Sequence, residues 1–396
     1  MKRLAALLVI LSGAAALYLA KSHGPARSTP SRPWLFVYNA VAHDATLLAD
    51  PARADGPRVT LDCLELPEWA LRVGVHGDEL VLLDPKQFSI LTLSTSALRR
   101  AAEGDAPCSA ARPRRVPLHA AQVPYRGLLD GDRLYVSYFS GNLVEVYAST
   151  GGAGPGWKLE SELRFPASEN LGLSDLAVTG GQLAVAATGY FCYSRVCPEG
   201  HFRPPRVFFA DLHGATHGPF PEARPANINS SGLYLDPSGA LFVINSGDYG
   251  GGYGSVQRLH PDRTVGPEIR LPRAAAPGSA HALGGGLFAV LQFSGEHLFV
   301  VDGAGERLRR ILRFDGKGFV DLPLDTAQLP DRSASDLQDV VPDPASPNAF
   351  FVVDAKREML LHVAFDAPSA SLRLMSTTPL AGSGFRTSPA WAVWLR

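Results

Sequence analysis

The sequence predicts an all-β fold, a seven-bladed β-propeller with four-stranded blades, and three observations predict it. Short apolar, β-rich runs recur along the whole chain. The 39 glycines and 32 prolines fall between these runs, which is typical of turns in an all-β repeat protein. The two ends of the chain carry incomplete units that complement each other. We therefore expect little helix and a closed ring.

The clearest unit lies at residues 134–147. Two apolar runs, Leu134 to Tyr138 and Leu143 to Tyr147, flank a Phe-Ser-Gly-Asn corner and predict a β-hairpin. The same Phe-Ser-Gly corner returns at Phe293. Looser copies of the apolar run lie at residues 35–39, 80–84, 183–187, 241–245 and 350–354. The repeat of one hairpin favours one repeated blade over a pair of β-sandwiches.

Another short strand precedes most hairpins, and a fourth strand follows most of them. The predicted inner strands are residues 69–73, 126–129, 176–178, 232–235, 280–283 and 337–341. The predicted fourth strands include residues 59–66, 159–165, 269–271, 308–314 and 372–377. Counting from Trp69 gives six complete units.

The two chain ends supply the seventh blade. Residues 389–395 have the pattern of an inner strand without a hairpin, and residues 34–39 have that of a hairpin strand without an inner strand. If the C-terminal strand joins the N-terminal blade, the ring closes and leaves no exposed sheet edge at the join.

The hairpin at residues 134–147 resembles those of YVTN-type and lactonase-like seven-bladed β-propellers. The resemblance covers residues 34–396 as architecture, and it encodes strands and turns rather than chemistry. It implies an alternative function, because some propeller lactonases use Glu, Asn and Asp on a divalent ion to polarise an ester carbonyl. The lactonases that carry this ion are typically six-bladed.

The N-terminus predicts export. Lys2 and Arg3 precede an apolar run over residues 4–20, so residues 1–21 read as a signal peptide or a signal anchor. Residues 22–33, rich in Pro, Ser and Arg, predict a flexible tether, and residues 34–396 form the propeller domain. We expect a periplasmic, extracellular or membrane-anchored protein that faces outside the cytoplasm.

The four cysteines of an exported chain predict disulfides. Cys192 and Cys197 share one loop and are expected to pair, which leaves Cys63 to pair with Cys108. A zinc site of Cys192, Cys197 and His201 is the alternative, disfavoured because an oxidising compartment consumes thiolates. The formal net charge of -1 gives no bias toward nucleic acid, which we do not expect as a partner.

One rim of the predicted ring carries the long loops, over residues 189–205, 246–254, 273–279 and 323–335. The leading hypothesis is an exported binding or scaffold module that recognises a protein, peptide or glycan with this rim. The predicted binding residues are Tyr190, Phe191, Tyr193, Arg195, His201, Arg203, Asp248, Tyr249 and Tyr253. The alternative is that these rings only pack over the blade ends.

A second candidate site lies where the inner strands begin, at the mouth of the central channel. The predicted metal ligands are Glu68, Asp175, Asn229 and Asp336. Asp339, Arg126 and His281 are expected at or beside the same point. Such oxygens suit Ca²⁺ or Mg²⁺ and would make a divalent-metal-dependent lactonase-like hydrolase. The Ser-Asp-Leu triplets at Ser174 and Ser335 equally fit a structural role, in which Asp binds neighbouring backbone. No catalytic residue is identified. A serine hydrolase is disfavoured because the chain has no Gly-x-Ser-x-Gly elbow.

Overall fold

The computed structural model describes residues 33–53, 55–151, 156–165, 170–190, 200–212, 214, 218–248, 252–330, 333–380 and 389–395. Residues 34–396 make one compact unit. The predicted export signal and all but the last residue of the predicted tether lie outside the described residues. None of the helices in the described ranges is long and apolar enough to cross a membrane.

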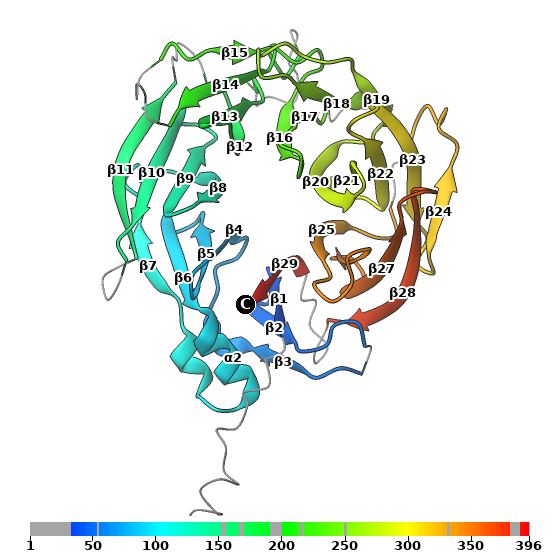
Figure 1. Cartoon of the computed structure of the whole chain (residues 1–396). Helices are drawn as coiled ribbons and strands as arrows, with labels where there is room; N and C mark the ends of the chain where they lie inside the picture. The colour runs from blue at the N-terminus through cyan, green and yellow to red at the C-terminus, as the bar shows by residue number, and fades with distance from the viewer. Residues whose placement is uncertain are drawn as a thin grey trace, which may run out of the picture. The chain divides into compact units, whose positions relative to one another are not determined.

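Seven antiparallel sheets form in the described part of the chain and stand in a ring around a common axis (Figure 1). The first three complete blades are β4 (Leu71–His76), β5 (Glu79–Asp84), β6 (Ser89–Ser94) and β7 (Arg114–Pro117); β8 (Pro124–Asp130), β9 (Arg133–Tyr138), β10 (Leu143–Ser149) and β11 (Trp157–Arg164); and β12 (Leu173–Thr179), β13 (Gln182–Ala187), β14 (Arg206–Asp211) and β15 (Glu222–Ala223).

The next three blades continue in chain order. They are β16 (Ser230–Leu235), β17 (Leu241–Asn245), β18 (Tyr253–Leu259) and β19 (Ile269–Arg273); β20 (Pro277–Gly284), β21 (Leu287–Gln292), β22 (His297–Asp302), β23 (Arg307–Phe314) and β24 (Phe319–Leu322); and β25 (Leu337–Pro342), β26 (Ala349–Asp354), β27 (Met359–Asp366) and β28 (Ser371–Pro379). The predicted inner strands are thereby confirmed.

The closing blade joins the two ends of the chain as predicted. β29 (Pro389–Leu395) pairs with β1 (Trp34–Asn39), and β2 (Asp44–Leu48) and β3 (Arg58–Leu61) complete the sheet. The ring of Trp391 lies 4.9 Å from that of Tyr38 and 5.8 Å from that of Phe36. Burial of these aromatic rings and the β29–β1 ladder hold the ring shut.

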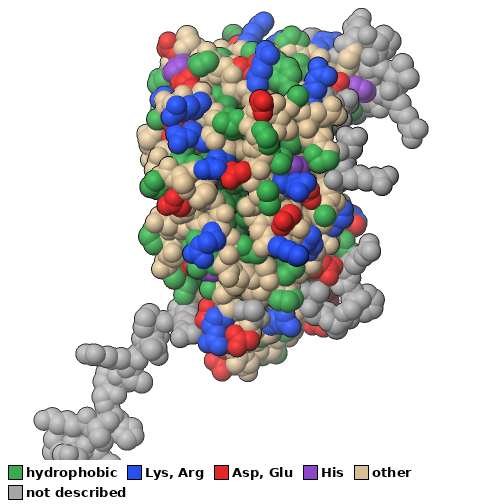
Figure 2. All heavy atoms as spheres, turned by 90° about the vertical axis from the view of Figure 1, so that its right-hand side faces the viewer, with side chains coloured by type: hydrophobic (Ala, Val, Ile, Leu, Met, Phe, Trp, Pro, Cys, Tyr) green, Lys and Arg blue, Asp and Glu red, His purple; other side chains and the backbone are tan. Residues whose placement is uncertain are grey.

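Middle strands are buried on both faces because blades stack face to face. All five residues of β17 and all six of β26 are buried, which explains why both strands are continuously apolar up to their last residues, Asn245 and Asp354, instead of alternating. Many charged side chains lie on the outer strands. Figure 2 shows basic and acidic side chains interspersed along the outer edge, where Arg310 pairs with Asp321 at 2.8 Å.

Two features depart from the predicted blade. A helix, α2 (Thr95–Glu103), and the 3-10 turn η2 (Cys108–Ala111) follow β6, and the blade that starts at β20 has the fifth strand β24. Ser94 caps α2 by accepting the N–H of Ala97 at 3.1 Å, and Leu98 is fully buried in the core of the neighbouring blade. The prediction of little helix thus holds for most of the ring but misses this insertion.

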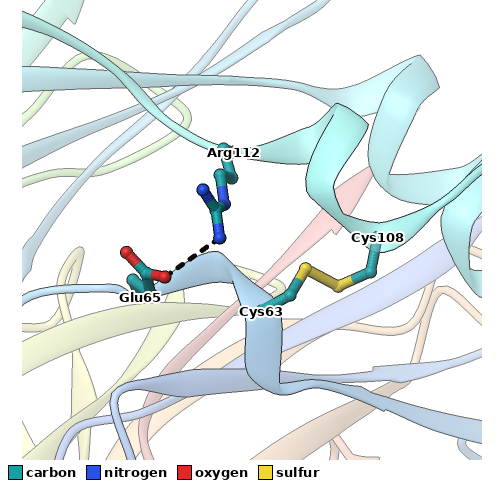
Figure 3. The surroundings of a disulfide bond; sticks show 4 residues. All are labelled: Cys63, Glu65, Cys108 and Arg112. Carbon is teal, nitrogen blue, oxygen red and sulfur yellow. Dashed lines mark hydrogen bonds and ion pairs between the residues drawn. A yellow bond between two sulfur atoms is a disulfide. The ribbon is translucent and has the colours of Figure 1, made fainter.

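The predicted Cys63–Cys108 disulfide is present, with Cα atoms 6.0 Å apart. It joins η1 (Asp62–Leu64), which follows β3, to η2, so it links the closing blade to the next blade (Figure 3). An ion pair of Arg112 with Glu65 at 3.1 Å lies beside it. The predicted Cys192–Cys197 pair lies outside the described residues.

The alternation of strands divides the connections between two rims. Inner strands begin on one rim, where the turns between second and third strands and the links to the next inner strand also lie; we call it the loop rim. The opposite rim carries tight two-residue turns between the first and second strands, at residues 131–132 and 180–181. Gly131 and Gly180 adopt φ of 55° and 54° there, which explains the choice of glycine.

Candidate functional site: the loop rim and the channel mouth

Bulges interrupt six inner strands near their first residues. The pairing shifts between Arg72 and Gly74, Pro124 and Arg126, Leu173 and Asp175, Ser230 and Gly232, Pro277 and Ala280, and Leu337 and Asp339. A bulge redirects side chains away from the regular alternation. Ionisable side chains beside these bulges meet across blades in what we call the channel-mouth cluster, which consists of Arg72, Arg126, Asp175, His281 and Asp339.

Asp175 and Asp339 occupy equivalent positions in their blades and have the same structural role. Each is opposite the last residue but one of its neighbouring second strand. Asp175 accepts the backbone N–H of Leu233 at 2.8 Å, and Asp339 accepts that of Ala392 at 2.9 Å. Both donors lie on the inner strand of the following blade, whose inner edge has no pairing strand. The two carboxylates therefore link adjacent blades, the structural role that the sequence analysis kept open.

The Ser-Asp-Leu repeat does not mark equivalent positions. Asp336 precedes β25, whereas Asp175 is the third residue of β12, so the register relates Asp175 to Asp339 instead. The sequence analysis placed the repeat at the starts of two inner strands without allowing for the bulge.

The two arginines of the cluster differ in how tightly they are held. Arg72 donates from one nitrogen to Asp339 and to the carbonyl of Ala392, the latter at 2.7 Å. Arg126 makes one ion pair in the described structure, from Nε to Asp175 at 3.4 Å, and its side chain is 41% exposed. Since Asp175 also accepts two backbone N–H groups, it does not depend on Arg126. Arg126 is therefore the cation of the cluster best able to bind a ligand.

His281 is neutral at physiological pH. Burial lowers its pKa to about 4; nearby Asp339 opposes this shift, and Arg72 and Arg126 add to it. Its Nε2 lies 3.0 Å from the hydroxyl of Ser279 and 4.0 Å from Oδ1 of Asp339. Because one ring nitrogen faces both groups, the three residues do not form a Ser-His-Asp relay, which needs the two different nitrogens.

The four predicted metal ligands have separate partners. Glu68 binds Lys86 and the indole N–H of Trp69, Asn229 donates to the carbonyl of Gly247 at 3.1 Å, and Asp336 accepts from Gln338 at 2.7 Å. Among the described His, Cys, Asp and Glu residues, the only trio with ligand atoms within 4.8 Å of one another is His119, Glu145 and Glu162. Glu68, Asp175 and Asp336 therefore do not come together, and we assign no step to a metal ion.

Within this trio, Glu145 lies in the hairpin of residues 134–147, and it was not among the predicted site residues. Glu145 is fully buried and accepts hydrogen bonds from the hydroxyls of Tyr138 and Tyr147 and from the N–H of Ala120. Burial first, and the hydrogen bond to Glu145 second, raise the pKa of both tyrosines. A Glu within an otherwise apolar strand was the available signal. The carboxylate is satisfied by three donors, so the network stabilises the hairpin.

The predicted aromatic loops are only partly described. Phe191, Tyr193, Arg195 and Tyr249 lie outside the described residues. Tyr190 packs toward Phe202 at 5.1 Å and toward Phe139 of the preceding blade at 6.2 Å, and Phe139 lies 5.0 Å from Tyr125. The ring contacts from Tyr190 through Phe139 to Tyr125 thus cross from one blade to the preceding blade.

The other predicted binding residues fall into local contacts. The imidazole of His201 stacks on Tyr190, with ring centres 6.3 Å apart, and the backbone N–H of Arg203 bonds to the carbonyl of Gly189 at 2.9 Å. The carbonyl of Asp248 accepts from Gly252 at 3.1 Å. Tyr253 lies under the guanidinium of Arg270 at 4.7 Å, within its own blade.

Exposed apolar side chains gather on the loop rim, and the sequence analysis did not select them. Of the large hydrophobic side chains exposed in the described ranges, five lie on this rim: Val41 at 48%, Trp69 at 54%, Val123 at 58%, Tyr125 at 41% and Phe293 at 61%. Four of these come from three consecutive blades, beginning with the closing blade. For Trp69 and Tyr125, the sequence signal that could have identified them was an aromatic residue just before or at the start of an inner strand.

Comparison with known proteins supports the fold and no more. No protein-family model and no curated protein matches the chain. Among solved structures, a putative 6-phosphogluconolactonase from Bacteroides fragilis NCTC 9343 has a TM-score of 0.56 at 12% identity, with 93% of this chain and 99% of that chain covered. A virginiamycin B lyase from Staphylococcus aureus has a TM-score of 0.54 at 10% identity, covering 81% and 87%.

A streptogramin B lyase structure is similar too, with a TM-score of 0.53 at 11% identity and coverage of 81% and 85%. These neighbours confirm the resemblance to lactonase-like seven-bladed propellers as architecture. At such identities they show the fold alone.

Proposed function

We propose that this chain is a binding module that receives an acidic segment of a protein or peptide on its loop rim. A ligand carboxylate binds Arg126, and apolar ligand side chains cover Trp69 and Tyr125. The observation that carries the proposal is the half-exposed, singly paired guanidinium of Arg126 next to the 41% exposed Tyr125. Arginine with exposed aromatic anchors is the composition that dominates protein–protein binding energy.

Two further features favour this surface. Trp69 adopts a left-handed backbone with φ of 62° while its ring stays exposed, so burial of the ring does not offset the backbone strain. Arg72 and Asp339 both bond to Ala392, so they hold the three consecutive inner strands β25, β29 and β4 together beside Arg126 before the ligand arrives. A preorganised surface loses less entropy on binding.

Random 12-residue peptides displayed on phage and selected on the purified protein test the proposal. Acidic residues flanked by apolar residues should be enriched. Arg126→Gln should weaken the selected peptides about 10- to 100-fold, as expected for a hydrogen bond to a charged group. Arg133→Gln is the matched control, because Arg133 pairs with Glu160 at 2.8 Å on the opposite rim. Failure to enrich any acidic peptide sinks the proposal.

We place this activity outside the cytoplasm: in the periplasm, in the extracellular space, or at a membrane to which the N-terminal segment anchors the protein. The Cys63–Cys108 disulfide supports the placement, since such bonds persist in oxidising compartments. Fractionation of cells that express the full chain with a C-terminal tag tests it. Recovery of the protein in the cytoplasm with reduced thiols contradicts it.

A second candidate is an enzyme at the same channel mouth, with His281 as the proton acceptor. The neutral imidazole beside Ser279 favours it, and so do the structural neighbours named as lyases and as a putative lactonase. A base with a pKa of about 4 would give activity that is independent of pH above about 5. The substrates to test are streptogramin B compounds and a panel of sugar lactones. Each is assayed with and without Ca²⁺ or Mg²⁺. Turnover that survives His281→Gln would exclude this role.

A further inference from the structure

Two glutamates lie directly opposite each other in the blade that begins with β8. Glu145 in β10 pairs in register with Glu162 in β11, so both side chains stand on the same face of the sheet. Glu145 is fully buried, and the side chain of Glu162 is 18% exposed. Like charges in directly opposed positions destabilise a sheet. A positive charge beside both carboxylates would remove this repulsion.

The described structure supplies little positive charge to Glu145. Its hydrogen-bond donors are neutral: the N–H of Ala120 at 2.6 Å and the hydroxyls of Tyr138 and Tyr147. Among the described residues, the imidazole of His119 is the only basic group within 4.0 Å of this carboxylate, with Nδ1 3.6 Å from Oε1. Buried charges in proteins are paired or coordinate a metal ion. The surroundings of Glu145 thus favour a cation, which is either protonated His119 or a bound metal ion.

The ligand atoms of three side chains converge as a metal site requires. Nδ1 of His119 lies 3.0 Å from Oε1 of Glu162 and 3.6 Å from Oε1 of Glu145, and the three atoms all lie within 4.8 Å of one another. Arg164 pairs with the other oxygen of Glu162, Oε2, and leaves Oε1 facing the imidazole. Zn²⁺ binds such nitrogen and oxygen atoms at about 2.0–2.2 Å in a tetrahedron, which sets neighbouring ligand atoms about 3.4 Å apart. The two shorter separations lie on either side of this value, so small side-chain shifts bring the atoms onto one ion.

Hydrogen bonds hold two of these ligands in place. The hydroxyl of Tyr147 donates to Oε2 of Glu145 and accepts the backbone N–H of His119 at 2.8 Å. Partners of this kind orient the ligands of metal sites. The N–H of Ala120 takes one lone pair of Oε1 of Glu145, which leaves the other lone pair for an ion. The side chain of His119 is 64% exposed, so an ion can enter from solvent and keep a water molecule as its fourth ligand.

We infer that His119, Glu145 and Glu162 bind one Zn²⁺ ion. The imidazole among the three ligands favours Zn²⁺ over Ca²⁺ and Mg²⁺, which prefer oxygen ligands. The ion ties the turn that leads into β8 to strands β10 and β11 of the same blade. This site shares no residue with the channel-mouth cluster and does not depend on the proposed peptide function.

Calorimetric titration of the full chain with Zn²⁺ tests the site, after treatment with EDTA and without a reductant. His119→Gln and Glu162→Gln are the test variants, because both side chains reach solvent and neither accepts from the donors that hold Glu145. His76→Gln is the matched control. His76 also pairs with a carboxylate, that of Asp132 at 3.0 Å, but it belongs to no such trio among the described residues.

The wild-type protein should bind a single Zn²⁺ ion and should bind it more tightly than Ca²⁺. Each test variant should weaken Zn²⁺ binding at least about 10-fold, since even the partners that orient metal ligands contribute that much. His76→Gln should leave the affinity unchanged. X-ray absorption of the bound ion should show nitrogen and oxygen neighbours at about 2.0–2.2 Å and no sulfur.

The inference is overturned if Zn²⁺ does not bind, which would leave protonated His119 as the cation beside Glu145. It is also overturned if Zn²⁺ binding survives both test substitutions, if the control loses as much affinity as the test variants, or if Ca²⁺ binds as tightly. Sulfur neighbours would place the ion at the cysteines and would overturn it as well.

Discussion

Asp339 should be among the most costly residues to replace at the channel. Its side chain is 4% exposed, and its carboxylate accepts hydrogen bonds from Arg72 and from the N–H of Ala392 in the closing strand β29. Asp339→Ala removes the oxygen, Oδ2, that accepts both hydrogen bonds. Breaking a buried ion pair from one side costs about 3–5 kcal/mol. Arg72 is 33% exposed and keeps its bond to the carbonyl of Ala392, so we expect a value near 3 kcal/mol.

Urea titration at pH 7 measures the loss, and hydrogen exchange of the β29 amides locates it. Exchange should rise first in β29, since Ala392 loses its acceptor. Asp321→Ala is the matched control, because Asp321 is 54% exposed and pairs with Arg310 on an outer strand. The control should cost less than about 1 kcal/mol. Equal losses for the two variants would refute the conclusion that Asp339 links its blade to the closing strand.

Two further predictions concern stability. Lowering the pH from about 6.5 toward 4 should destabilise the protein, because burial lowers the pKa of His281 from 6.5 to about 4 and only the unfolded chain then accepts the proton. The full loss in the free energy of unfolding is about 3 kcal/mol. His281→Gln should reduce the slope of this free energy, measured by urea titration, against pH. An unchanged slope would refute the conclusion that the imidazole of His281 is neutral in the folded protein. Replacing Cys63 and Cys108 by Ser should cost up to about 4 kcal/mol by freeing a 45-residue loop; an unchanged urea midpoint would show that the bond does not constrain the unfolded chain.

The blade architecture could be predicted because it depends on local patterns that every blade repeats. Middle strands such as β17 and β26 read as continuous apolar runs, and turn residues such as Gly131 and Gly180 mark where the chain reverses. The incomplete ends of the chain predicted the β29–β1 pairing. Helix α2 was missed because it has nine residues and buries only three of them. A helix this short depends on its cap and on tertiary packing rather than on its own periodicity.

The site was less predictable, because bulges set its register. A shift of one residue moves a side chain to the other face of a strand, and the sequence does not fix where the shift falls. The prediction therefore paired Asp175 with Asp336, whereas the register pairs Asp175 with Asp339. Arg72 was missed because its partner Asp339 lies 267 residues away.

The interaction of Arg126 with a ligand carboxylate tests the central claim most directly. A double-mutant cycle combines Arg126→Gln in the protein with Glu→Gln in a selected peptide, and fluorescence anisotropy measures the four dissociation constants. Our account predicts a coupling of about 1.5 kcal/mol or more, with no loss of affinity in the Arg133→Gln control. A coupling near zero, or equal losses for Arg126→Gln and Arg133→Gln, would contradict binding at the channel mouth.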